Sequence, residues 1–326
     1  MNTVDTLKNV HKHYDAIRKE VSKVIIGQDD VLEALLIALF SKGHAQLVGV
    51  PGLAKTLMIQ SLADVMDLEF KRIQFTPDLM PSDITGTEVI EEDRNSGRRE
   101  FRFIKGPVFG NIILADEINR TPPKTQSALL EAMQEKQVTA AGQSHQLDAP
   151  FFVLATQNPI EQEGTYPLPE AQLDRFMFQL KVGYPDLEEE KEIVNRTTVA
   201  TKTMVKKVIS KEELISIQEA ITEIPVAEHI VDYAVAMVRA SRPEISVLPM
   251  LKKYVKWGAG PRASQYMIIA AKTRAALLAK LTPDEDDIRA VAPLVLRHRI
   301  LRNFKAEADG VSVEAIIDEL TQVAHD

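Results

Sequence analysis

The chain carries the stretch Gly49-Val50-Pro51-Gly52-Leu53-Ala54-Lys55-Thr56, which follows the apolar run 45–50 and precedes a helical pattern over 57–66. A strand, a glycine-containing loop and a helix form a cradle for phosphate, because backbone N–H groups and the helix N-terminus face the anion. We expect Lys55 to reach the outer phosphates and Thr56 to offer its hydroxyl to Mg²⁺. Ala54 replaces the glycine that usually precedes the lysine, which weakens this match when it is taken alone.

The composition is that of an ordinary globular protein with about two domains. The chain has 326 residues, of which 45% are hydrophobic and 26% are charged, and its net charge is −8. This acidic balance argues against a duplex-DNA binder, whose surface is usually basic. The sequence contains no cysteine, which excludes disulfides and cysteine-ligated zinc. Its seven histidines lack the spacing of metal ligands.

No stretch of the sequence resembles a membrane segment. No apolar run reaches the roughly 18 residues that span a bilayer, and the nearest candidate, 32–40, contains Glu33. Residues 1–10 are polar and lack the apolar core of a signal peptide. We therefore expect a cytoplasmic protein without a membrane span.

Short apolar runs alternate with helical patterns over residues 1–183. Continuous apolar runs are typical of strands buried on both faces of a parallel sheet, and their alternation with helices favours an open α/β sheet. Strands are predicted at 45–50, 70–75, 111–115, 151–155 and 176–182, and helices at 2–24, 29–41, 57–67 and 123–134.

Two segments interrupt this alternation and predict β-hairpins. Residues 87–103 have a period-two pattern around the turn 94–97, and residues 137–147 surround the turn 141–143. The first hairpin mixes arginines with acidic residues, which favours a solvated ribbon over a nucleic-acid patch.

A boundary is predicted at Tyr184-Pro185-Asp186, after which the strand signal largely disappears. Residues 1–183 are therefore predicted to form the α/β core, and residues 184–326 an all-helical lid. A capping box of Thr282 and Glu285, with Pro283 at the first helical position, predicts one helix start. Lid helices are predicted at 187–197, 211–221, 227–239, 261–280 and 283–301.

Two adjacent carboxylates, Asp116 and Glu117, follow the apolar run 112–115. Charge is costly to bury unless it is paired or used, and the carboxyl ends of parallel strands line the ligand crevice of an open sheet. We expect Asp116 to share Mg²⁺ with Thr56 and Glu117 to act as the general base on an attacking water. The alternative, a strand end that meets solvent, is disfavoured by the phosphate-loop pattern upstream.

The strand 152–155 ends in the polar trio Thr156-Gln157-Asn158. An amide at this edge of the sheet could orient the water or contact the γ-phosphate, and Asn158 is a better candidate than Gln157. The alternative interpretation is a turn-forming asparagine before Pro159.

Two arginines are candidates for contacts with phosphate. Arg175 follows Asp174 just before the last strand and could reach a neighbouring subunit's γ-phosphate as an arginine finger; alternatively, the two form a surface pair. Arg262 falls in the first turn of a helix begun by Pro261, where a cation opposes the helix dipole. A bound nucleotide phosphate would offset this cost, whereas the alternative is a tolerated surface arginine.

Together these residues resemble the AAA+ superfamily, and most closely the MoxR family of AAA+ ATPases. The resemblance spans nearly the whole chain, and Ala54 is usual in that family. Gly258-Ala259-Gly260 departs slightly from the family's commoner sequence. The segments that carry the resemblance to the MoxR family are 24–28 (VIIGQ), 49–56, 78–86 (DLMPSDITG), 116–120 (DEINR), 122–131 (PPKTQSALLE), 155–159 (ATQNP), 164–176 (GTYPLPEAQLDRF) and 260–263 (GPRA).

The resemblance implies an αβα core with a five-stranded parallel sheet and hairpin inserts, a helical lid, and an ATPase that uses ATP and Mg²⁺. It implies Lys55, Glu117, Asn158, Arg175 and Arg262 in catalysis, and Thr56 and Asp116 at the metal. Arg120 is a further candidate for contact across an interface. Nucleotide contacts are implied for Ile26 and Gly27 near adenine, and for Gly49, Val50, Pro51, Gly52, Leu53, Ala54, Lys55, Thr56, Leu57, Asp116 and Arg262.

The same resemblance implies a ring oligomer, for which six subunits are expected, with each site shared between neighbours. Its work would be chaperone-like remodelling of a client protein, with von Willebrand factor A domain proteins as a candidate class. Two alternatives stay open: a nucleotide-gated binding module with little turnover, and a DNA-remodelling AAA+ motor. The acidic balance makes nucleic acid an unexpected partner.

Overall fold

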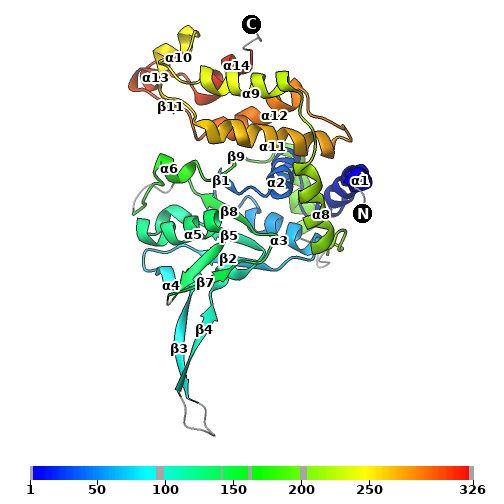
Figure 1. Ribbon diagram of the computed structural model, residues 1–326, viewed down its shortest axis with the longest axis vertical. Helices are drawn as coiled ribbons and strands as arrows, with labels where there is room; N and C mark the ends of the chain where they lie inside the picture. The colour runs from blue at the N-terminus through cyan, green and yellow to red at the C-terminus, as the bar shows by residue number, and fades with distance from the viewer. Residues whose placement is uncertain (1–2, 93–98, 141, 161–163, 199–203, 323–326) are drawn as a thin grey trace.

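The computed structural model describes residues 3–92, 99–140, 142–160, 164–198 and 204–322. A five-stranded sheet lies at its centre (Figure 1), with all strands parallel and the order β2-β5-β8-β1-β9. The parallel sheet predicted from the apolar runs is confirmed. Its strands are β1 (Ala45–Gly49), β2 (Phe70–Gln74), β5 (Ile112–Asp116), β8 (Phe152–Gln157) and β9 (Phe178–Val182).

Alternate residues of the central strands face two separate hydrophobic cores. In β5, Ile112 and Leu114 join one core, whereas Ile113 and Ala115 join the other. Since successive side chains of a strand point to opposite faces, a run that is apolar throughout requires cover on both sides. The first core includes α1 (Thr3–Val21), α2 (Asp29–Phe40) and α3 (Lys55–Val65), and the second includes α5 (Pro123–Glu135).

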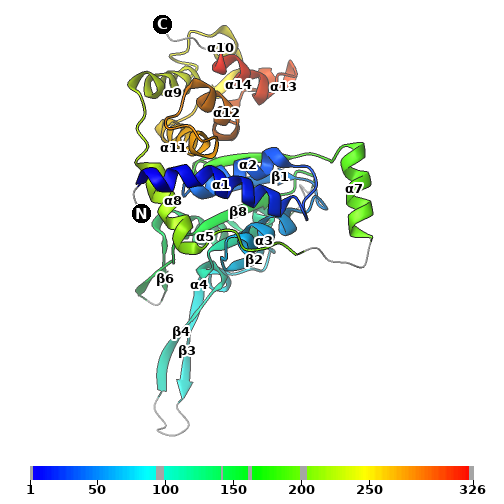
Figure 2. The same ribbon diagram turned by 90° about the vertical axis from the view of Figure 1, so that its right-hand side faces the viewer.

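Two hairpins extend from the side of the sheet that the second core covers. The first, β3 (Gly86–Glu92) with β4 (Arg99–Lys105), follows α4 (Pro81–Thr85) and projects far from the sheet (Figures 1 and 2). The second is β6 (Gln137–Ala140) with β7 (Gln143–Gln146). The rings of Phe103 and His145 stack with their centroids 4.0 Å apart, which joins the hairpins at their bases. The predicted turn 94–97 and Ala141 lie outside the described residues.

Residues 184–322 are mostly helical, as expected, in the part that the structure describes. Helix α7 (Leu187–Thr197) stands apart at one side of the molecule in Figure 2, whereas α8 (Lys211–Thr222) packs on α1 and α2. One short antiparallel pair, β10 (Val255–Trp257) with β11 (Leu301–Arg302), joins the helices. The helices are α7 (Leu187–Thr197), α8 (Lys211–Thr222), α9 (Glu228–Ala240), α10 (Pro249–Tyr254), α11 (Pro261–Leu277), α12 (Glu285–Leu296), α13 (Phe304–Ala308) and α14 (Val313–Thr321).

The predicted cap of α12 is wrong. Asp284, not Thr282, is the N-cap: its carboxylate accepts from the backbone N of Asp287 at 3.1 Å, and Asp287 accepts in return from the N of Asp284. Asp287 is fully buried and also binds Arg274 and Lys280. The helix start is therefore fixed by the capping box of Asp284 and Asp287, and the ion pairs of the buried Asp287 with Arg274 and Lys280 add to it.

His44 fastens the start of β1 to β8 and gives the fold a pH dependence. Its Nδ1 accepts from the N of Val153 at 3.0 Å, and its Nε2 lies 3.3 Å from the carbonyl of Met133. Burial lowers the pKa of His44 from its usual 6.5 to about 4, so between these values the unfolded chain binds a proton that the folded chain excludes. This stability is complete above pH 6.5 and is lost as the pH falls toward 4, by about 3 kcal/mol at most.

We therefore expect the unfolding free energy, measured by denaturant titration, to fall between pH 7 and pH 4. His44→Gln should flatten this slope, because glutamine does not titrate there. Burial also lowers the pKa of His298 well below its usual value, so part of the slope should remain until His298 is replaced as well. An unchanged slope in His44→Gln would contradict this account.

Candidate active site

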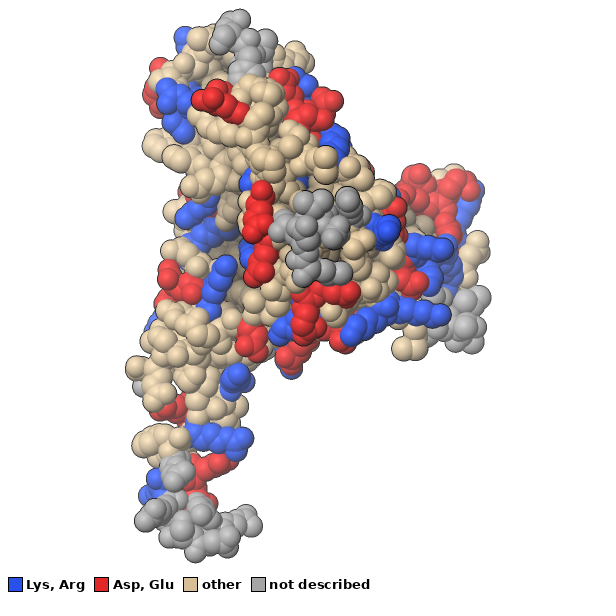
Figure 3. All heavy atoms as spheres, turned by 45° about the vertical axis from the view of Figure 1, so that its right-hand side comes forward, with Lys and Arg blue, Asp and Glu red and all other residues tan. Residues whose placement is uncertain are grey.

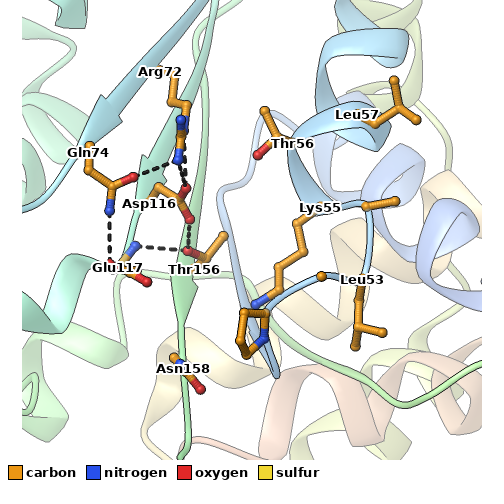
Figure 4. Close-up of a pocket in the computed structure, with 13 residues that line it drawn as sticks. Leu53, Lys55, Thr56, Leu57, Arg72, Gln74, Asp116, Glu117, Thr156 and Asn158 are labelled. Carbon is orange, nitrogen blue, oxygen red and sulfur yellow. Dashed lines mark hydrogen bonds and ion pairs between the residues drawn. The ribbon is translucent and has the colours of Figure 1, made fainter. Parts of the chain in front are cut away.

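A cavity of about 510 Å³ opens at the carboxyl edge of the sheet (Figure 4). This is the edge at which open parallel sheets bind ligands. The cavity brings together the phosphate-loop pattern and the polar ends of β2, β5 and β8, as the sequence predicted for β5 and β8. It is lined by Pro51, Gly52, Leu53, Ala54, Lys55, Thr56, Leu57, Arg72, Gln74, Asp116, Glu117, Thr156 and Asn158.

The loop enters α3 through two residues in the left-handed region. Gly52 has φ +86°, and Ala54, the N-cap of α3, has φ +52°. The side chain of Lys55 bends back so that its Nζ donates to the carbonyl of Gly49. Burial lowers the pKa of Lys55, and Asp116 and Glu117 oppose that shift. The two carboxylates thus help to hold a cation at the base of the cavity.

The left-handed Ala54 predicts a stability effect. An L-residue with a side chain is strained in this region and glycine is not, and Ala54 is exposed, so its methyl group contributes little packing. Ala54→Gly should raise the unfolding free energy by about 1 kcal/mol. Thermal denaturation without nucleotide measures this.

Gly52→Ala is the matched control for Ala54→Gly. A Cβ at Gly52 would meet nothing within 4 Å, so it adds backbone strain alone and should destabilise by a similar amount. If both variants shifted the midpoint in the same direction, strain would not be the cause.

Asp116 has both carboxylate oxygens engaged. Oδ1 accepts from the hydroxyl of Thr156 at 2.6 Å, and Oδ2 accepts from Nε and Nη2 of Arg72 at 3.1 and 2.6 Å. Thr56 and Asp116 lie on opposite sides of the same cavity (Figure 4). A hydroxyl and a carboxylate are the hard oxygen ligands that suit Mg²⁺, which takes its other ligands from water and phosphate. The residues therefore fit the ion, provided that Arg72 moves aside.

Glu117 has a strained backbone and is held by hydrogen bonds of its backbone N and of one carboxylate oxygen. It has left-handed backbone angles (φ +58°, ψ +48°), and its N donates to the hydroxyl of Thr156 at 2.9 Å. Its Oε2 accepts from Gln74 Nε2 at 2.9 Å and from Arg120 Nη1 at 3.0 Å. Backbone strain of this kind is often found at functional sites. The two donors, Gln74 and Arg120, thus fix the direction of the Glu117 carboxylate.

Sequence reasoning missed Arg72, Gln74 and Thr156. Gln74 ends β2 as Asp116 ends β5, so the rule that placed Asp116 at the carboxyl edge would also have found Gln74. Arg72 has no such signal, because it lies inside the strand and reaches the site by its length alone.

Asn158 combines both interpretations of the polar trio. Its Oδ1 accepts from the N of Ile160 at 3.1 Å, which is the turn geometry, while the residue also lines the cavity. With the oxygen engaged, the side chain has N–H donors to offer a ligand. Gln157 is instead part of an amide ladder across the sheet: it accepts from Gln46 at 3.0 Å, and Gln46 accepts from Gln179 at 2.8 Å.

A second cavity of about 790 Å³ adjoins the loop on the side of α7. Ile26, Leu53 and Leu57 line it, together with Val194 of α7. Gly27 lines a smaller neighbouring cavity, has φ +66°, and lies so close to Glu189 that a Cβ would come within 2.4 Å of that carboxylate. The predicted adenine contacts thus lie beside the phosphate loop, under a cover that α7 supplies.

Known proteins share this arrangement. A model of the ATPase family associated with various cellular activities (AAA) matches residues 44–178, and an AAA lid domain model matches residues 250–320. The chaperone MoxR1 of Mycobacterium tuberculosis is 47% identical over 93% of this chain and 79% of its own length. This chain belongs to the MoxR family of AAA+ ATPases.

Two further relatives extend the likeness of this MoxR-family chain. The uncharacterized protein YeaC of Bacillus subtilis is 44% identical over 93% of this chain and 91% of its own length. A crystal structure from Cytophaga hutchinsonii, of a protein assigned as an ATPase, is 43% identical and superposes with a TM-score of 0.91, covering 98% of this chain and 97% of that one. The fold of core and lid is therefore shared along the whole chain.

The two predicted phosphate-contacting arginines of this MoxR-family chain do not line its own cavity. Arg262 donates from Nη1 to Oδ2 of Asp174 at 2.8 Å, and Tyr266, one turn later in α11, donates to the carbonyl of Arg175 at 3.2 Å. The structure thus links the backbone of Arg175 to α11, the helix that carries Arg262, and neither arginine lines the cavity of Lys55 and Glu117.

Proposed function

We propose that this MoxR-family ATPase hydrolyses ATP in a ring whose active sites are shared by neighbouring subunits. One observation supports this above all: the cavity holds Lys55, Thr56, Asp116 and Glu117, while neither Arg175 nor Arg262 lines it, and both are tied to α11 or to the adjacent Asp174. A site that lacks its phosphate-contacting arginines within one chain is complete only when a second chain supplies them. Arg262, expected from its helix position to meet nucleotide, is therefore proposed to act with Arg175 on the neighbour.

The residues of the cavity divide the work of hydrolysis. Lys55 and the loop N–H groups bind and orient the phosphates, and the apolar cavity beside Ile26 and Leu57 takes the adenine. Glu117 accepts the proton of the attacking water on its carboxylate, and an N–H of Asn158 orients that water or the γ-phosphate. When bound at Thr56 and Asp116, Mg²⁺ neutralises the charge on the phosphate oxygens.

The larger organisation is proposed on the same basis. Residues 1–183 form the nucleotide-binding core and residues 184–326 the lid, with α8 packing back on the core. We propose a ring of six subunits that remodels a client protein complex, with a von Willebrand factor A domain protein as a candidate client. The relative from M. tuberculosis is named a chaperone, which supports a protein client.

A protein client is also supported by the surface. Lys and Arg are interspersed with Asp and Glu over the face shown in Figure 3, and this face has no broad basic patch. Along the first hairpin, Arg102 pairs with Glu91 and Arg99 with Glu92, so these cations are already neutralised. No helix of the described residues is long and apolar enough to cross a membrane.

The shared site is tested by ATP hydrolysis at increasing protein concentration. The rate per chain should rise steeply through the concentration at which light scattering detects assembly, because only assembled chains have complete sites. A rate per chain that stayed constant down to the monomer would contradict shared sites. Slow hydrolysis that Glu117→Gln left unchanged would instead favour a nucleotide-gated binding module.

A further inference from the structure

Asp174 bridges two arginines at the junction of core and lid. It directly follows α6 (Glu170–Leu173) and directly precedes Arg175. Its Oδ2 accepts from Nη1 of Arg262 at 2.8 Å, and its Oδ1 accepts from Nε of Arg299 at 2.8 Å. One carboxylate therefore fixes the position of residue 174 from both helix α11 and the turn that follows α12.

Arg299 is a buried anchor for the segment that carries Arg175. It is 7% exposed and donates to the carbonyls of Asp174, Phe176 and Met177 at 2.9, 2.7 and 3.2 Å. Its guanidinium lies 5.2 Å from the ring centroid of Tyr266. A buried guanidinium requires a partner charge, and Asp174 supplies it. The backbone on both sides of Arg175 is thus tied to one rigid cation.

Tyr266 holds the remaining backbone group. Its hydroxyl donates to the carbonyl of Arg175 itself, and burial raises the pKa of Tyr266, so the hydroxyl keeps its proton. Arg262 and Tyr266 are one turn apart and so lie on one face of α11. The same face of one helix therefore presents Arg262 and holds Arg175 in place.

We infer that Asp174 and Tyr266 are positioning residues that hold Arg175 and Arg262 as one two-arginine unit directed at the neighbouring subunit's nucleotide. This inference rests on the shared site proposed above. Asp174 uses a single N–H of Arg262, which leaves the other donors of that guanidinium for phosphate. Its negative charge also offsets the repulsion between the guanidinium groups of Arg262 and Arg299, both of which it binds.

Asp174 could instead be a purely structural link between lid and core. The two roles differ in which subunit's active site depends on Asp174. A structural link would serve the chain that contains it, whereas a positioning residue of this unit serves the pocket of the next chain. Asp174→Asn removes the charge and keeps the shape. We expect it to lower the turnover number by about 10–10²-fold, as misplacement of a catalytic group by about 1 Å does, with the apparent affinity for ATP changed much less.

Subunit mixing separates the two possibilities. Asp174→Asn chains keep an intact pocket, and Glu117→Gln chains keep an intact two-arginine unit, so co-assembly should restore activity that neither variant has alone. Arg175→Ala mixed with Glu117→Gln is the matched control for the shared site. If the control recovers activity and the Asp174→Asn mixture does not, the inference is overturned and the shared site stands. If neither mixture recovers, the shared site fails, and the inference with it.

Tyr266→Phe carries the test should Asp174→Asn not fold. It removes only the hydroxyl that binds the carbonyl of Arg175, in a side chain that otherwise keeps its packing. We expect a loss of about 2–10-fold in turnover, restored on mixing with Glu117→Gln chains. If Asp174→Asn folds, wild-type turnover in both variants would overturn the inference. If Asp174→Asn does not fold, wild-type turnover in Tyr266→Phe alone would overturn it.

Discussion

Glu117→Gln is expected to lower the turnover number for ATP by about 10²–10⁴-fold while ATP still binds. Glutamine keeps the size of the side chain and can still accept from Gln74 and Arg120, which hold Oε2 of Glu117 at 2.9 and 3.0 Å. It cannot take a proton from water near neutral pH. Steady-state phosphate release measures the loss, and equilibrium titration with a fluorescent ATP analogue measures binding.

Lys55→Ala is the contrasting control, because it removes the cation that meets the phosphates. That variant should lose nucleotide binding and turnover together. Turnover at the wild-type rate in Glu117→Gln would remove Glu117 from the role of general base. Loss of binding in Glu117→Gln would instead show that the carboxylate serves the fold of the pocket.

Arg175→Ala is expected to lower turnover by about 10³-fold or more, the contribution of an arginine finger to phosphoryl transfer. The effect should fall on the chemical step, because Arg175 does not line the cavity of its own chain. ATP binding by isolated chains should therefore be unchanged. The measurement is turnover at saturating ATP, with assembly checked by light scattering at the same concentration.

Arg175→Lys keeps the charge but loses the planar fork that grips phosphate oxygens in pairs. It should recover only part of the lost rate. If Arg175→Ala weakened ATP binding in monomers as much as it slowed turnover, Arg175 would belong to its own chain's pocket, and the shared site would need revision.

The sheet and the place of Asp116 and Glu117 at its carboxyl edge were predictable because they depend on local composition. The run 112–115 is apolar at every position, which only a strand covered on both faces explains, and the charges that follow must then lie at the ligand edge. The sequence predicted that Ala54 lies in the phosphate loop, but it did not predict the backbone conformation of Ala54. Its left-handed backbone follows from the path of the loop into α3, and the amino-acid sequence alone does not reveal that path.

The remaining parts depend on long-range contacts. Arg72 reaches Asp116 across 44 positions of sequence, and Arg299 reaches Asp174 across 125. No spacing rule connects such pairs. Arg262 was expected beside nucleotide from its place at a helix start, but its partner in the chain is Asp174. The cap of α12 was misplaced for a local reason, since Asp284 and Asp287 have the same three-residue spacing as Thr282 and Glu285 and form the capping box instead.

The guanidinium of Arg72 serves as the counter-ion of the Asp116 carboxylate in the pocket. If Mg²⁺ binds at Asp116 as proposed, it would have to displace the guanidinium of Arg72 from Oδ2, so that loading the site would exchange one cation for another. Arg72, whose side chain is 48% exposed, would then find a new partner in the phosphate oxygens of a nucleotide that entered with the metal. We therefore expect the pocket to bind the metal–nucleotide complex in preference to either component alone, because Arg72 of the edge strand β2 competes with the metal for the Asp116 carboxylate.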